Sequence, residues 1–100
     1  MAVRLAVDKQ RIAEFCRKWR VKELSVFGSA LRDDFGPESD VDVLVELEPD
    51  HGLVMYDWLR MIEELQGIFG RRVDLVARGG LKNAIRRERI LRTAEVLHAA

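Results

Sequence analysis

The stretch that decides the fold is FGSALRDDFGPESDVDVLVEL, residues 27–47. A Gly-Ser turn is followed by an acid-rich polar loop, and then by a hydrophobic segment that opens with Asp40 and Asp42. The alternation in VDVLVEL (41–47) predicts a β-strand, because successive side chains of a strand point to opposite faces of the sheet. Asp40 and Asp42 therefore share one face, with Cα atoms about 7 Å apart at a rise of ~3.3 Å per residue, and the valines take the other.

The segments around this strand predict a small α/β (α+β) domain that spans residues 1–100. Helices are expected at 9–20, after an N-cap at Asp8, at 53–69 and in the tail from residue 81. Further strands are expected at 23–28 and 72–77, whereas residues 94–98 fit either a helix or an edge strand. The helix between strands 41–47 and 72–77 permits them to be parallel neighbours, and the direction of the first strand stays open. The expected architecture is a small mixed sheet flanked by helices.

Composition excludes several classes of function. Acidic and basic residues balance at seventeen each, so the net charge gives no reason to expect direct nucleic-acid binding. No apolar run approaches the roughly 20 residues that span a bilayer. The start MAVRLAVDKQ turns polar too soon for a signal peptide, and the single Cys16 cannot form an internal disulfide. We therefore expect a soluble cytoplasmic domain with no membrane contact.

Asp74 interrupts the third predicted strand as Asp42 interrupts the second. Val73, Leu75 and Ala77 share one face of that strand, and Asp74 takes the other. If the strands are neighbours at the usual ~4.8 Å, Asp74 joins Asp40 and Asp42. Such carboxylates repel each other by roughly 2–3 kcal/mol per pair at an effective dielectric constant near 20, so a cation is expected among them. Oxygen ligands favour Mg²⁺ or Mn²⁺, although aspartates at strand ends also occur simply as turn caps.

The Gly28-Ser29 turn directly follows the first predicted strand. Glycine lets the backbone approach a ligand closely, and free N–H groups at the start of a helix favour phosphate oxygens. The Ser29 hydroxyl adds a further donor. The turn is therefore a candidate phosphate-binding element.

A basic cluster in the tail is predicted to be a solvated helix face, with contact to an acidic partner or to nucleotide phosphates as the alternative; its members are Arg86, Arg87, Arg89 and Arg92.

Gly28-Ser29, ten intervening residues, Asp40-Val41-Asp42 and the later Asp74 together resemble the signature of the DNA polymerase beta-like nucleotidyltransferases. The short length and the RRVDLV segment are similar to the minimal nucleotidyltransferases, the MNT antitoxins that are paired with HEPN-domain toxins. The resemblance covers nearly the whole chain, including RERILRTA near its end. Arg32 matches the arginine of the family's GSxARG pattern, and Asp33 stands where that pattern has glycine.

The resemblance implies a fold, a reaction and roles for particular residues. Gly28, Ser29 and Arg32 would bind the nucleoside triphosphate. Asp40, Asp42 and Asp74 would bind Mg²⁺ or Mn²⁺, and Asp74 would also help to deprotonate the attacking hydroxyl. The chain would transfer AMP from ATP to a tyrosine of a HEPN ribonuclease toxin and release pyrophosphate.

A chain of 100 residues leaves little room for a separate acceptor-binding domain, so a hetero-oligomer with the toxin is expected. Two alternatives compete with this reading. One is a non-catalytic antitoxin that neutralises the toxin by binding and occlusion. The other, weaker for lack of an acceptor domain, is nucleotidylation of a small molecule.

Overall fold

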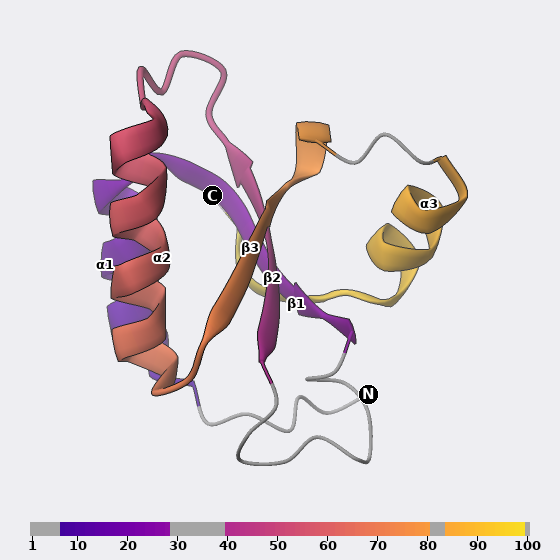
Figure 1. Cartoon of the computed structure of the whole chain (residues 1–100), viewed down its shortest axis with the longest axis horizontal. Helices are drawn as coiled ribbons and strands as arrows, with labels where there is room; N and C mark the ends of the chain where they lie inside the picture. The colour runs from indigo at the N-terminus through magenta and orange to yellow at the C-terminus, as the bar shows by residue number, and fades with distance from the viewer. Residues whose placement is uncertain (1–6, 29–39, 81–83, 100) are drawn as a thin grey trace.

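The computed structural model describes residues 7–28, 40–80 and 84–99. Its elements follow in the order α1 (Lys9–Lys18), β1 (Val21–Phe27), β2 (Val41–Leu47), α2 (Met55–Phe69), β3 (Val73–Ala77), the 3-10 turn η2 (Arg78–Gly80), α3 (Ala84–Thr93) and β4 (Glu95–Ala99) (Figure 1). The predicted helices and strands are present, with ends shifted by a few residues. The tail that fitted either a helix or a strand forms strand β4.

The described strands form a four-stranded sheet in the order β3-β2-β1-β4. β2 and β3 are parallel, whereas β1 runs antiparallel to both β2 and β4. The predicted mixed sheet is therefore confirmed, and the direction of β1, which the sequence left open, is settled as antiparallel. β3 and β4 form the two edges of the sheet.

Local chemistry sets the ends of the helices. The Asp8 side chain caps α1 by accepting hydrogen bonds from the backbone N–H groups of Gln10 (3.1 Å) and Arg11 (3.2 Å). α2 ends at Gly70, which adopts the left-handed conformation (φ 68°) that glycine reaches without strain. The Asp57 carboxylate at the start of α2 accepts from the Val54 N–H at 3.0 Å. Within the described residues, no helix is long and apolar enough to cross a bilayer.

The main core lies between the sheet and the pair of helices α1 and α2, which cover one face of the sheet (Figure 1). The alternating valines of β2 point into it as predicted, and Cys16 of α1 is buried there. Its buried members are Ile12, Phe15, Cys16, Val21, Leu24, Val26, Val41, Val43, Val45, Met61, Leu65, Phe69, Val73 and Leu75. A smaller cluster, built on Phe27, Leu44 and Ile90, lies on the opposite face under α3.

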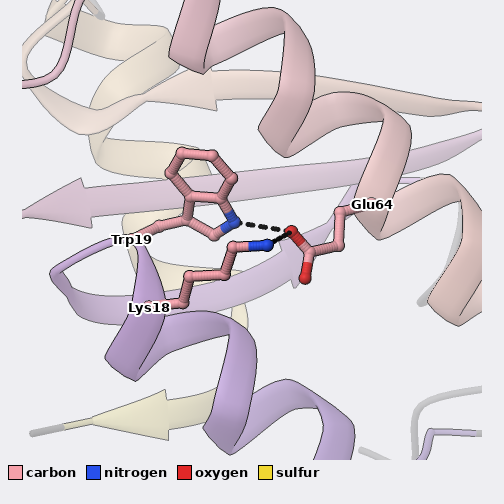
Figure 2. A network of polar contacts seen from close by, with 3 residues as sticks. All are labelled: Lys18, Trp19 and Glu64. Carbon is pink, nitrogen blue, oxygen red and sulfur yellow. Dashed lines mark hydrogen bonds and ion pairs between the residues drawn. The ribbon is translucent and has the colours of Figure 1, made fainter.

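A polar contact joins the two helices at the rim of the main core. The Trp19 Nε1–H donates to Glu64 Oε2 at 2.7 Å, and Lys18 Nζ lies 3.3 Å from the same oxygen (Figure 2). The Lys18 ammonium also lies 5.0 Å from the centre of the Trp19 ring. Trp19 is half-buried against the core.

Candidate active site

The register of β2 and β3 brings two of the predicted carboxylates together. Asp42 is the direct partner of Asp74 in the parallel pair, and Leu44 is the partner of Val76 two residues further on. Leu44 and Val76 pack in the small cluster under α3, so the period of two places Asp42 and Asp74 on that same face. Asp42 is half-buried and Asp74 is exposed. The predicted neighbourhood of these two aspartates is therefore confirmed by the sheet.

Gly28 lies against the Asp42 carboxylate. Phe27, the last residue of β1, pairs with Asp42 across the antiparallel ladder, and Gly28 follows it with φ +65°. A Cβ added to Gly28 would come within 2.5 Å of Asp42 Oδ2, which is too close for any side chain. Glycine is favoured here by the left-handed backbone, and a larger residue would also force the Asp42 carboxylate to move.

Asp40 directly precedes β2 and is paired with an arginine. Its Oδ1 lies 3.2 Å from Arg72 Nε, and the Val41 N–H donates to the Arg72 carbonyl at 2.9 Å. This backbone hydrogen bond holds the starts of β2 and β3 together, so the side chains of Asp40 and Arg72 meet at the same end of the two strands. Sequence reasoning missed Arg72; the signal for it was an arginine placed directly before the strand that carries Asp74.

Several predicted residues lie outside what the structure describes. Ser29 and Arg32 fall in residues 29–39, so their assignment to the nucleotide stays a prediction. In the basic cluster of α3, Arg89 and Arg92 are exposed, and Arg92 pairs with Glu88 one turn earlier. These two fit the predicted solvated helix face, and the side chains of Arg86 and Arg87 are not among those described.

The donor set has the chemistry that Mg²⁺ prefers, since the three aspartates offer only hard oxygen ligands. Among the described residues, no three His, Cys, Asp or Glu side chains are arranged to hold a metal ion by themselves. Mg²⁺ characteristically takes one or two carboxylates and completes its shell with water and substrate phosphates. The adjacent Asp42 and Asp74 fit that kind of open site better than a closed protein cage.

Two hollows in the described surface lie away from these residues. One of about 590 Å³ is formed at the opposite ends of β2 and β3, where Glu46, His51 and Arg78 are among its lining residues. Arg78 Nη1 lies there 2.8 Å from Glu46 Oε1 and 3.6 Å from Glu23 Oε2. None of the predicted site residues lines this hollow. The paired carboxylates and the turn at Gly28 are a stronger guide to the site, because carboxylate oxygens suit Mg²⁺ and a glycine turn suits phosphate.

Comparison with known proteins identifies the family of the chain. A family model for the nucleotidyltransferase domain matches residues 9–96. The protein adenylyltransferase MntA of Thermococcus cleftensis is 36% identical over 81 residues, which are 81% of this chain and 77% of that protein. A candidate protein adenylyltransferase of Methanocaldococcus jannaschii is 35% identical over 66 residues, or 66% of each chain.

Solved structures share the fold. A candidate minimal nucleotidyltransferase superposes with a TM-score of 0.71 at 32% identity, covering 87% of this chain and 86% of that one. A tri-AMPylated HEPN toxin in complex with its MNT antitoxin, from Shewanella oneidensis, gives a TM-score of 0.61 at 16% identity, over 92% of this chain and 70% of that one. The family match over most of the chain and the two relatives above 30% identity lead to one conclusion: this chain belongs to the nucleotidyltransferase family.

Proposed function

We propose that this protein transfers AMP from ATP to a tyrosine of a partner HEPN ribonuclease toxin and so acts as its antitoxin. The observation that carries the proposal is the in-register pair of Asp42 and Asp74, with Gly28 packed against the Asp42 carboxylate. The 36% identity to a protein adenylyltransferase supports the reaction. The chain also shares its fold with a chain of the complex between a tri-AMPylated HEPN toxin and an MNT antitoxin, and this match supports the class of partner. We also infer a cytoplasmic location, where ATP is present and the single Cys16 stays reduced.

The reaction is an in-line displacement at the α-phosphorus of ATP. The tyrosine oxygen forms a new bond to that phosphorus, the bond to the β-phosphate breaks, and pyrophosphate leaves with the electron pair. The hydroxyl proton passes to a carboxylate. Asp74 is suited to this role because its side chain is exposed and open to an incoming hydroxyl. Catalysis of this kind depends mainly on positioning and on charge stabilisation.

The roles proposed for the site residues are those that the resemblance to the family implies. Asp40, Asp42 and Asp74 would hold Mg²⁺ or Mn²⁺, which, when bound, neutralises charge on the phosphate oxygens. Gly28, Ser29 and Arg32 are proposed to bind the triphosphate, with Ser29 and Arg32 donating to its oxygens. ATP is the proposed nucleotide.

The test is transfer of label from α-labelled ATP to purified HEPN toxin in the presence of Mg²⁺. Wild-type protein should label the toxin, and Asp42→Asn should reduce the rate by at least about a hundredfold, because a metal-binding carboxylate is lost. Asp50→Asn, a matched change in the exposed turn after β2, should leave the rate unchanged. Equal labelling by the Asp42 variant and wild type would contradict the assignment, and no labelling by wild type would contradict the reaction.

A further inference from the structure

Arg72 directly contacts one of the predicted metal-binding carboxylates, that of Asp40. Its Nε lies 3.2 Å from Asp40 Oδ1. The contact is built into the sheet, since the Val41 N–H donates to the Arg72 carbonyl and so ties the start of β3 to the start of β2. The backbone therefore keeps Arg72 beside Asp40, with its guanidinium within reach of the carboxylate.

The pair is open to water. The Arg72 side chain is 81% exposed and that of Asp40 is 51% exposed. Exposed ion pairs are weak, because water screens them and because two long side chains must be held in one geometry. A cation with a higher charge density can therefore replace the guanidinium at Asp40 without rearrangement of the fold.

We propose that Arg72 is the counter-ion of Asp40 in the metal-free protein, and that a divalent cation displaces it from Asp40 on entering the site. The inference rests on the proposed function, in which Asp40 is a metal ligand. Arg72 would then be a positioning residue that acts through Asp40. It neutralises part of the acidic cluster when no cation is bound, and it lowers the affinity of the site for a free cation. The site would fill less readily with metal alone than its three carboxylates suggest.

The experiment is a double-mutant cycle on Mn²⁺ binding, measured by calorimetry or by electron paramagnetic resonance, with no nucleotide and no toxin present. Arg72→Gln should bind Mn²⁺ about two- to fivefold more tightly than wild type, the range expected when a weak competing ion pair is removed. In the Asp40→Asn background the same change should have no effect, because the competition acts through Asp40. Arg60→Gln removes an equal charge from the exposed surface of α2 and should leave the affinity unchanged.

An unchanged or weaker Mn²⁺ affinity in Arg72→Gln would overturn the proposal. An equal gain in the Asp40→Asn background would also overturn it, since the arginine would then act only through its general field. Absence of Mn²⁺ binding to wild type at millimolar concentration would do the same. Thermal unfolding of each variant verifies that the fold is kept. Because the cycle uses neither ATP nor toxin, it can fail while AMP transfer stands, and AMP transfer can fail while the cycle holds.

Discussion

The two faces of the sheet differ in how they are covered. On one face, α1 and α2 bury a continuous apolar core that includes Leu24 and Leu65, both fully inaccessible to water. On the other, α3 covers only a small cluster around Leu44, with Asp42 and Asp74 at one end and the charged group around Arg78 at the other. Because side chains alternate along a strand, β2 contributes valines to the main core and Leu44 to the small cluster. The larger apolar core thus lies on one side of the sheet, and the carboxylates of Asp42 and Asp74 lie on the other.

Matched leucine truncations give the largest expected change in stability. Leu24→Ala empties a fully buried site in the main core and should lower the free energy of unfolding by about 3–5 kcal/mol. Leu44→Ala, on the neighbouring strand but in the small cluster, should cost about 2–3 kcal/mol, because the thinner layer can relax around the cavity. Urea unfolding measures both. Equal losses in the two variants would mean that the two faces of the sheet contribute equally to stability.

A glycine substitution separates backbone strain from damage to the site. Gly28→Ala should lower the free energy of unfolding by about 1–2 kcal/mol through its left-handed φ, and should also abolish AMP transfer, because the new Cβ displaces the Asp42 carboxylate. Gly52 has almost the same φ (+69°), and a Cβ there would meet nothing within 4 Å. Gly52→Ala should therefore show a similar loss of stability with full transfer. Loss of transfer in both variants would refute a specific role for Gly28.

The contact between α1 and α2 should make a smaller contribution. Trp19→Phe keeps an aromatic ring but removes the N–H that donates to Glu64, and should cost about 0.5–1.5 kcal/mol because the acceptor is partly exposed. Lys18→Gln removes the exposed ion pair to the same oxygen and the cation–π contact with the Trp19 ring, and should cost less than about 1 kcal/mol because the ammonium is exposed. Thermal unfolding of both variants tests this order. A larger loss of stability for Lys18→Gln than for Trp19→Phe would show that Lys18, and not the Trp19 N–H, makes the larger contribution.

The burial of Cys16 in the main core predicts an effect confined to alkaline pH. Desolvation raises the pKa of its thiol from the ordinary 9.0 to about 12, so the folded protein keeps the proton over a range in which the unfolded chain loses it. The unfolded state then binds fewer protons, and the free energy of unfolding should fall as pH rises from about 9 to about 12. Cys16→Ala should remove this part of the slope. Alkylation at pH 8 should be slow in the native protein and fast in urea.

Much of the fold could be predicted because apolar periodicity is strong in β2 and α2. The direction of β1 could not, since a connection of about a dozen residues allows either direction. The five residues of β4 were ambiguous because a short segment with exposed Val96 has no decisive period, and pairing with β1 decides it. His51 is half-buried and its Nδ1 accepts the Leu53 N–H at 2.8 Å, a contact within the loop that no periodic pattern in the sequence indicates.

The site was predictable in part for similar reasons. Asp42 and Asp74 followed from alternation along two strands, whereas their mutual register depends on long-range pairing. The ion pair of Arg72 with Asp40 was not predictable, because the residue lies just outside a strand where no periodic pattern applies. The positive φ of Arg20 (56°), at a position after α1 where glycine is usual, was likewise invisible in the sequence pattern.

The most direct test of the account is the state of the HEPN toxin after the protein has been removed. Toxin is incubated with this protein, ATP and Mg²⁺, separated under dissociating conditions, refolded, weighed by intact mass spectrometry and assayed for ribonuclease activity. The account predicts toxin that is heavier by whole AMP units and stays inactive, while toxin treated with the Asp40→Asn, Asp42→Asn double variant keeps its mass and recovers. Unmodified mass and full recovery after treatment with wild-type protein would contradict catalysis and favour neutralisation by occlusion.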